Sequence, residues 1–288
     1  MQTNIDVPPL VSVIVLTYNS SATVVETLES VKIQTYCNLE LIISDDGSVD
    51  DTINKCKNWT EENKSRFQNL KILTSSNTGT ASNCNRGCKA AKGEWLKLIA
   101  GDDTLKQDGI EKLVKFALSD KSYEIVSGLV DIFGVKSKNY DDEIWNYYQK
   151  LHRAFDTAQE QYWYLIRKNF LAAMAVLMRK SLWIRVGGFD EEVPLLEDWP
   201  MWLKITKAGV MIHFFEEKVA NYRLSSGSVR SNYKFLYSII LFRYKYIYQE
   251  MDKFEKLKKM RFLENQNIFT RIVFYLIGRD IAKHAPLW

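Results

Sequence analysis

The sequence has little of several features that mark common protein classes. Its 288 residues include only four cysteines and five prolines, too few for a disulfide-stapled secreted domain or a proline-rich disordered chain. The longest uninterrupted apolar run is residues 170–178, whereas a bilayer-spanning helix needs about 20 residues. Residues 1–9 lack the basic and then apolar pattern of a secretory signal. We therefore expect a cytoplasmic protein with reduced thiols.

Common catalytic motifs are also absent. The sequence has no G-x-x-x-x-G-K-[ST] loop, no G-x-G-x-x-G fingerprint, no G-x-S-x-G elbow and no H-E-x-x-H pair, which excludes the commonest nucleotide, hydride-transfer and hydrolytic motifs. Cys84 and Cys88 lack the second pair that a zinc site needs.

The charge that is present is unevenly distributed. Residues 226–288 hold 12 Lys and Arg against 5 Asp and Glu, a net charge of +7, whereas residues 1–225 have a net charge of −3. The acidic part suits a metal ion or a cationic ligand, and the basic tail suits an anionic surface. We predict a globular domain of residues 1–228 and a basic, aromatic-rich helical extension of residues 229–288.

The first 120 residues alternate between buried strand patterns and amphipathic helix patterns. Such alternation predicts an α/β fold with a mostly parallel sheet covered by helices on both faces. A further helix begins at Glu197 and ends at Gly209. The expected strands are residues 11–16, 39–44, 71–74, 94–100, 124–134, 171–178, 210–215 and 218–222.

Three polar clusters directly follow expected strands: Thr17–Asn19, Asp45–Asp46 and Asp102–Asp103. Ligands of parallel sheets bind at the carboxyl ends of the strands, so we expect the first two clusters to contact a nucleotide base and ribose. The adjacent carboxylates Asp102 and Asp103 suit Mg²⁺ or Mn²⁺. The alternative for each cluster is an ordinary turn or helix cap.

Glu197 and Asp198 open the late helix, and Asp198 is the candidate general base. The alternative is a helix cap, because acidic residues are stabilised at helix N-termini in any case. Trp199 and Trp202 follow directly, and we expect them to stack on a sugar unless they belong to the core.

These clusters follow one another in an order that resembles family 2 glycosyltransferases over about residues 10–230. The residues that carry the resemblance are V-S-V-I-V-L-T-Y-N (11–19), I-I-S-D-D-G-S-V-D-D-T (42–52), Asn77-x-Gly79, Asn85-x-Gly87, Gly93–Trp95, Gly101–Asp103, Gly187–Asp190, Glu197–Trp199 and Tyr222–Arg223.

The resemblance implies a GT-A fold, Rossmann-like with a mostly parallel sheet, and inverting transfer of a sugar by a hexosyltransferase. Asp198 matches the family's base, and Asp102, with Asp103 beside it, matches the position that holds Mn²⁺ or Mg²⁺. Glu197, Trp199 and Trp202 are then acceptor or sugar candidates. The implied nucleotide-sugar contacts are Thr17, Tyr18, Asn19, Asp45, Asp46, Arg86 for the diphosphate, and Asp102.

Three departures keep alternatives open. Ala100 stands where the family has the first Asp of D-x-D, Ser225 where a His is frequent, and Cys84 where an Arg is frequent. An inactive sugar-nucleotide-binding or scaffold protein is the main alternative. A sugar-nucleotide nucleotidyltransferase is the second, although the glycine-rich phosphate loop of that class is missing.

We expect a non-processive enzyme that extends a bacterial O-antigen or other surface polysaccharide on a lipid-linked acceptor, without a nucleic-acid partner. Aromatic residues recur at helical spacing in residues 235–246, and lysines cluster in residues 253–259. A helix of this composition suits peripheral binding to the anionic inner face of the plasma membrane. The alternative is that it packs on the catalytic domain.

Overall fold

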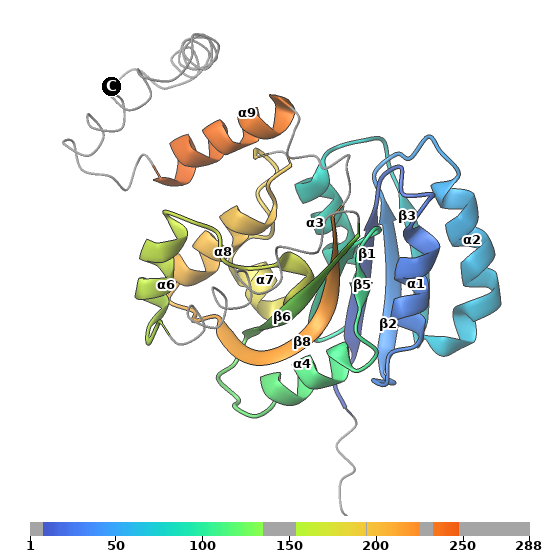
Figure 1. The fold of residues 1–288 in the computed structure, drawn as a ribbon, viewed down its shortest axis with the longest axis horizontal. Helices are drawn as coiled ribbons and strands as arrows, with labels where there is room; N and C mark the ends of the chain where they lie inside the picture. Colours follow the sequence, from blue (N-terminus) through green and yellow to red (C-terminus); the bar gives the residue numbers. More distant parts are fainter. Residues whose placement is uncertain (1–7, 135–153, 194, 225–232, 248–288) are drawn as a thin grey trace, which may run out of the picture. The chain divides into compact units, whose positions relative to one another are not determined.

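The computed structural model describes residues 8–134, 154–193, 195–224 and 233–247 (Figure 1). The chain divides into two compact units, Met1–Phe242 and Arg243–Trp288. Of the second unit, the model describes the π-helical turn Arg243–Ile247. The predicted domain boundary after residue 228 lies outside the described residues and stays a prediction.

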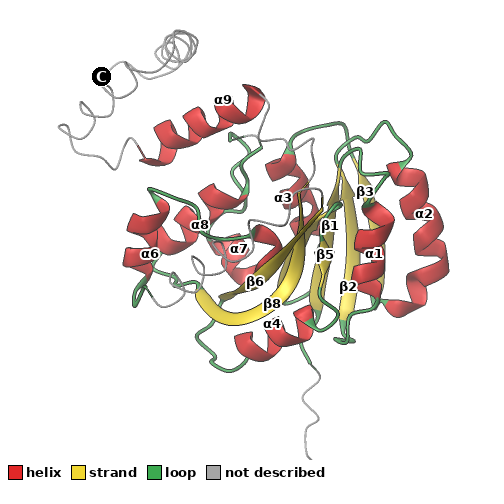
Figure 2. Cartoon of the chain, in the orientation of Figure 1, coloured by secondary structure: helices red, strands yellow, loops and turns green. Residues whose placement is uncertain are grey.

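One sheet organises the first unit (Figure 2). Among the described residues its strands lie in the order β3-β2-β1-β4-β7-β6-β8-β5. β1 to β4 run parallel, whereas β7 runs antiparallel to both of its neighbours. The mostly parallel sheet is confirmed. The strands are β1 (Val11–Thr17), β2 (Leu39–Asp45), β3 (Asn69–Thr74), β4 (Trp95–Ala100), β5 (Thr104–Leu105), β6 (Ile125–Gly134), β7 (Val176–Arg179) and β8 (His213–Leu224).

Helices cover both faces of this sheet. Apolar residues of α1, α2 and α4 form one core with Val11, Val13 and Val15 of β1. On the other face α3 packs closely, since a Cβ on Gly87 would lie 2.4 Å from Cγ2 of Ile14. The helices are α1 (Val24–Lys32), α2 (Thr52–Asn63), α3 (Thr80–Ala90), α4 (Gly109–Ala117), α6 (Ala158–Leu165), α7 (Lys180–Arg185), α8 (Asp198–Lys207) and α9 (Tyr233–Phe242).

Two expected strand patterns were wrong in detail. The run 171–178 contains a 3₁₀ turn, Ala173–Ala175, before β7 begins, because this turn brings the carbonyl of Met174 to the buried ammonium of Lys97. The two short strands expected within residues 210–222 are one strand, β8, which shifts register against β6 between Ser127 and Leu129. A bulge bends a strand without ending it.

No helix in the described part of the chain combines the length and the apolar character needed to cross a bilayer.

Candidate nucleotide-sugar site

The parallel register of three strands brings their polar ends to one edge of the sheet. Thr17 at the end of β1 lies opposite Asp45 at the end of β2, and Leu16 lies opposite Ala100 at the end of β4. The backbone N–H of Gly101 donates to the carbonyl of Leu16 at 2.8 Å. A Cβ on Gly101 would lie 3.1 Å from Cγ2 of Thr17, so the glycine lets the chain turn close to β1. The three predicted clusters therefore share one edge.

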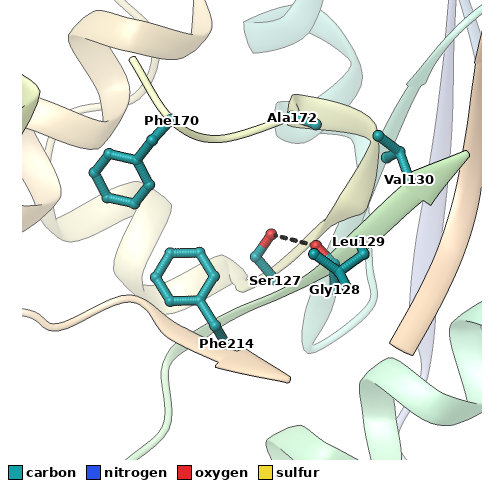
Figure 3. A pocket seen from close by; sticks show the side chains of 7 residues that line it. All are labelled: Ser127, Gly128, Leu129, Val130, Phe170, Ala172 and Phe214. Atoms are coloured by element: carbon teal, nitrogen blue, oxygen red, sulfur yellow. Dashed lines mark hydrogen bonds between the residues drawn. The ribbon is translucent and has the colours of Figure 1, made fainter. Parts of the chain in front are cut away.

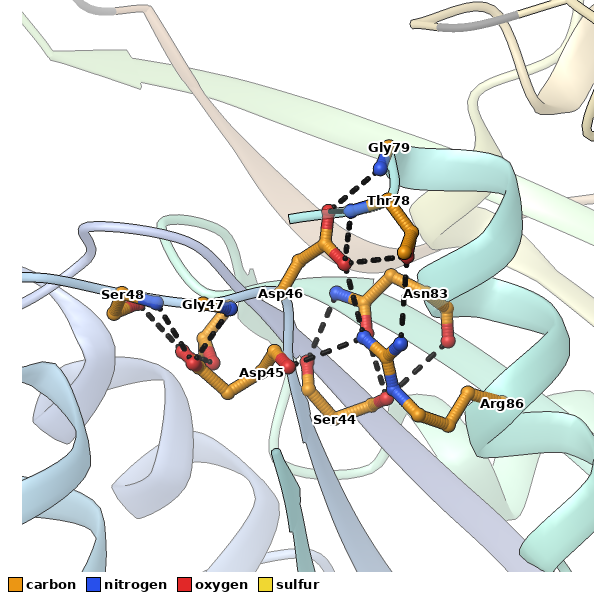
Figure 4. A network of polar contacts seen from close by, with 10 residues as sticks. Ser44, Asp45, Asp46, Gly47, Ser48, Thr78, Gly79, Asn83 and Arg86 are labelled. Carbon is orange, nitrogen blue, oxygen red and sulfur yellow. Dashed lines mark hydrogen bonds and ion pairs between the residues drawn. The ribbon is translucent and has the colours of Figure 1, made fainter. Parts of the chain in front are cut away.

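Asp45 organises the turn after β2 (Figure 4). Its carboxylate accepts hydrogen bonds from the Thr17 hydroxyl at 2.8 Å, from the N–H groups of Gly47 and Ser48 at 3.0 and 2.9 Å, and from the Ser48 hydroxyl. Gly47 has φ +82°, and a Cβ there would lie 2.8 Å from the backbone nitrogen of Asn77. The Asx-turn interpretation describes these contacts, and the nucleotide contact of Asp45 stays a prediction.

Tyr18 and Asn19 form the loop beside this turn. Asn19 is left-handed, with φ 50°, a conformation that Asn tolerates better than most residues. Its N–H donates to the Ser48 hydroxyl at 2.8 Å, and its Oδ1 accepts from the N–H of Val49 at 2.9 Å. The two loops are thus tied together, while the ring of Tyr18 is 51% exposed and free to meet a ligand.

Asp46 joins the loop after β3 to helix α3. Its carboxylate accepts from the N–H groups of Thr78 and Gly79, from the Thr78 hydroxyl, and from Nη2 of Arg86 at 3.0 Å. The same Nη2 donates to Oδ1 of Asn83 at 2.7 Å. Figure 4 shows the guanidinium lying within this network. The arrangement favours a structural role for Arg86 over the predicted diphosphate contact.

Asp102 and Asp103 follow β4 but differ in surroundings. Asp103 is 2% exposed, and its Oδ1 accepts from the backbone N–H of Arg223 on β8 at 2.9 Å. Burial, and then the adjacent Asp102 charge, raise the pKa of Asp103 to about 7. The Asp102 carboxyl is less enclosed, and burial raises its pKa as well. Asp103 therefore ties β4 to β8, whereas Asp102 is the better placed of the two for a ligand.

Asp102 stays the predicted ligand of a divalent ion, at a site that offers few other protein ligands. Among the described residues, no side chain donates a hydrogen bond to the Asp102 carboxylate, and the Arg223 guanidinium beside it bonds the Asp102 carbonyl oxygen. Within those same ranges, no three His, Cys, Asp or Glu side chains cluster as a metal site. An ion there would take its remaining ligands from diphosphate oxygens and water, as Mg²⁺ usually does.

Lys97 was missed by the sequence analysis. This residue of β4 is fully buried, and its ammonium donates to the carbonyl of Met174. Burial lowers the pKa of Lys97 to about 7, although the nearby Asp103 charge opposes the change. Side chains alternate between the two faces of a strand, so Lys97 lies on the same face of β4 as the core residues Trp95 and Ile99. This alternation is the sequence pattern that could have predicted a buried lysine.

Asp198 lies at the first turn of α8 with both carboxylate oxygens hydrogen-bonded. Oδ2 accepts from Nδ2 of Asn169 at 2.9 Å, and Oδ1 accepts from the N–H of Trp199 at 2.6 Å. Glu197 makes no side-chain cap at this helix end. Burial, and then the charge of Asp198, raise the pKa of Glu197 to about 7. Two neighbouring acids with different surroundings suit a site that handles protons.

The two tryptophans of α8 have different surroundings. Nε1 of Trp199 donates to the carbonyl of Leu165 at 2.7 Å, and its ring lies 4.5 Å from that of Phe242 on α9. Trp202 is 3% exposed, which favours the core interpretation for this residue. Trp199 is partly exposed and remains the better candidate for contact with a sugar.

Helix α3 links the base candidate to the nucleotide edge. Burial, and then the charges of Glu197 and Asp198 among its neighbours, raise the pKa of the Cys84 thiol. Cys84 therefore lies near the start of α8. The preceding residue, Asn83, accepts from the Ser44 hydroxyl at 2.6 Å, and Ser44 directly precedes Asp45. The start of α8 and the end of β2 thus both lie near this turn of α3.

A small, largely apolar recess lies between the start of β6 and the segments that carry Phe170 and Phe214 (Figure 3). Phe170, which lines it, directly follows Asn169, the partner of Asp198. The lining residues of the recess are Ser127, Gly128, Leu129, Val130, Phe170, Ala172 and Phe214.

The chain is similar to known glycosyltransferases. A model described as Glycosyl transferase family 2 matches residues 12–184. An uncharacterized glycosyltransferase of Haemophilus influenzae is 28% identical over 233 residues, covering 78% of this chain and 68% of that protein. The Escherichia coli UDP-Glc:alpha-D-GlcNAc-diphosphoundecaprenol beta-1,3-glucosyltransferase WfaP is 28% identical over 233 residues, covering 77% of this chain and 80% of that protein.

Among solved structures, the mannosyltransferase PcManGT from Pyrobaculum calidifontis, in complex with GDP-Man and Mn²⁺, superposes with a TM-score of 0.67. It is 19% identical, and the match covers 98% of this chain and 77% of that chain. A sheet of this topology with polar strand ends defines a Rossmann-like nucleotide-binding protein of the GT-A fold. The chain belongs to glycosyl transferase family 2 and is a nucleotide-sugar-dependent glycosyltransferase.

The Asp46–Arg86 ion pair leads to a stability prediction. Asp46→Ala removes the carboxylate partner of the Arg86 guanidinium and the acceptor of two backbone N–H groups, so we expect the free energy of unfolding to fall by about 3 kcal/mol. Urea denaturation measures it. Glu124→Ala is the matched control, because it removes the more exposed ion pair with Arg185 and should cost less than about 1 kcal/mol. Equal losses in both variants would contradict a structural role for the pair.

Proposed function

We propose that this chain is an inverting, metal-assisted, non-processive enzyme that moves a sugar from a nucleoside diphosphate sugar to a hydroxyl of a lipid-linked saccharide, in the synthesis of a bacterial surface polysaccharide. The observation that carries the proposal is the placement of Asp198. Its carboxylate accepts hydrogen bonds from Asn169 and Trp199 and lies near Cys84. Cys84 belongs to α3, the helix that also contacts the end of β2.

In the proposed reaction, Asp198 accepts the proton of the acceptor hydroxyl while that oxygen attacks the anomeric carbon. The bond from this carbon to the diphosphate oxygen breaks, and the diphosphate leaves with the bonding electrons. One displacement inverts the anomeric configuration. Asn169 and Trp199 each donate a hydrogen bond to one Asp198 oxygen, and these donors orient the carboxylate that takes the proton in the proposed reaction.

Asp102 is the residue that would hold a divalent ion, Mn²⁺ or Mg²⁺. When bound, such an ion supplies positive charge where negative charge develops on the departing diphosphate. The placement of Asp102 at the end of β4, one strand from Thr17, supports this role. We assign the exposed ring of Tyr18 to the nucleotide base, since aromatic rings stack on bases of any sequence.

The relatives support the donor and acceptor classes. The printed name of WfaP gives UDP-Glc as its donor and a diphosphoundecaprenol-linked sugar as its acceptor, and PcManGT was solved with GDP-Man and Mn²⁺. For this chain, the proposed membrane contact rests on the basic sequence of residues 253–261. That segment lies outside the described residues, and a lipid-linked acceptor would explain its charge.

Asp198→Asn is the direct test of the base. The amide keeps the shape of the side chain but cannot accept the acceptor proton, so we expect turnover to fall about 10²-fold or more. Nucleotide binding should stay close to that of the wild type. The measurement is release of nucleoside diphosphate from a panel of UDP- and GDP-sugars with Mn²⁺, paired with calorimetric titration of the nucleotide.

Asp120→Asn is the control for this change, because Asp120 is an exposed carboxylate in the turn after α4. The turnover of the Asp120→Asn variant should match that of the wild type. Unchanged turnover in Asp198→Asn would remove Asp198 from the mechanism. A wild-type protein that binds sugar nucleotides without releasing diphosphate would be the inactive scaffold. Release of pyrophosphate from a sugar phosphate and a nucleoside triphosphate would instead identify a nucleotidyltransferase.

Asp102→Ala tests the metal site separately. We expect the Mn²⁺-dependent part of nucleotide binding to weaken about tenfold or more, since a charged hydrogen-bond or metal partner is worth at least about 1.4 kcal/mol. Titration of the protein with UDP or GDP, once in the presence of Mn²⁺ and once in the presence of EDTA, gives that part as the difference between the two affinities. The comparison variant is Asp103→Asn, which should mainly lower thermal stability because Asp103 bonds the backbone of Arg223. Equal nucleotide affinity in Asp102→Ala and wild type, with and without Mn²⁺, would reject Asp102 as a ligand.

A further inference from the structure

Asn169 makes two hydrogen bonds that fix its side chain. Its Oδ1 accepts from the N–H of Leu171 at 3.1 Å, and its Nδ2 donates to Oδ2 of Asp198 at 2.9 Å. The first bond decides the second, because the amide oxygen is committed to the backbone and the NH₂ group must then face the carboxylate. The orientation of Asn169 is therefore set by its own loop and not by Asp198 alone.

The loop that carries Asn169 is anchored in an aromatic cluster. The next residue, Phe170, is 1% exposed. Its ring centroid lies 5.4 Å from that of Phe155, 5.5 Å from that of Tyr164 and 5.7 Å from that of Phe214. Aromatic contacts at such distances are stabilising. These ring contacts fix the backbone next to Asn169, whose side chain bonds Asp198 at the start of α8.

The surroundings of Asp198 make a hydrogen-bond donor valuable there. On its own helix the neighbouring titratable group is Glu197, and on α3 it is the Cys84 thiol. The Cys84 thiol is uncharged near pH 7 because its pKa is raised, whereas negative charge on Glu197 opposes a second negative charge on Asp198. On the loop before β7, Asn169 offers its NH₂ group to Oδ2 of Asp198. A donor to the ionised carboxylate favours the form that a general base needs.

We propose that Asn169 is a positioning residue for the transfer reaction, which keeps the Asp198 carboxylate ionised and fixes the direction of its oxygens toward the acceptor hydroxyl. This inference rests on the proposed role of Asp198 as the base. Asn169 acts through Asp198 and needs no contact with the donor sugar.

The variant Asn169→Asp separates this role from a structural one. An aspartate at position 169 has the same size and still offers an oxygen to the Leu171 N–H, but it places a carboxyl oxygen where the NH₂ group faced Asp198. We expect kcat near pH 7 to fall about 10- to 100-fold, with the donor KM nearly unchanged. The acid limb of the kcat–pH profile should move to higher pH, because losing the donor raises the pKa of the base.

Asn58→Asp is the matched control, since Asn58 is an exposed residue of α2 and the same charge change there should leave the profile as in wild type. If Asn169→Asp fails to fold, Asn169→Ser replaces it. The serine hydroxyl can accept from the Leu171 N–H but is too short to reach Asp198, so the same shift of the acid limb is expected. A folded variant with the wild-type kcat and acid limb would overturn the proposal.

The outcome for Asp198→Asn distinguishes the two levels of failure. Loss of turnover in Asp198→Asn, together with a wild-type profile in Asn169→Asp, rejects only the role of Asn169. Wild-type turnover in Asp198→Asn rejects the proposed base, and the inference about Asn169 fails with it.

Discussion

The parallel pairing of β1 with β2 and with β4 is the constraint on which the site depends. This register sets Thr17 opposite Asp45 and Leu16 opposite Ala100. A shift of one residue in either pairing would turn the side chains of that strand to the opposite face, so the buried apolar residues of β1 and the polar residues at its end are fixed together. The core of the protein and the position of its candidate site are therefore set by the same hydrogen bonds.

Within that frame, the acidic residues divide by the partners that surround them. Asp45, Asp46 and Asp103 are nearly inaccessible and accept hydrogen bonds that tie neighbouring loops and strands together. Buried carboxylates need such partners, because a buried charge without them is costly. Asp102 and Asp198 are partly exposed, and these are the two carboxylates to which we assign ligand contacts. One sequence signal, a carboxylate after a strand or before a helix, thus covers two physical roles.

Much of the fold could be predicted from the sequence because its signals are local. β-branched runs and helical periodicity located β1 to β4 and the helices between them, and Gly209, with φ +81°, ended α8 as expected. The interruption of residues 171–178 could not be predicted this way. It depends on a contact between Met174 and Lys97, which are far apart in the sequence.

The candidate site shows the same division. The positions of Thr17, Asp45 and Asp102 follow from the rule that parallel strands end at one edge. The pairing of Arg86 with Asp46 does not follow from it, and neither does the contact of Asn169 with Asp198, because each joins side chains that only tertiary packing brings together. Local patterns locate acidic groups, but only the long-range partners decide which of them remain available to a ligand.

We propose that Asp102 holds a cation and that Asp198, from a separate part of the chain, lies close to the same bound ligand. Paramagnetic line broadening by Mn²⁺ tests it most directly, with ¹⁵N-labelled protein in the presence of UDP or GDP. We expect the amide signals of Tyr18, Gly101 and Trp199 to lose intensity together, while that of Asn63 at the far end of α2 keeps its intensity. A Trp199 signal that keeps full intensity while that of Tyr18 disappears would contradict the account.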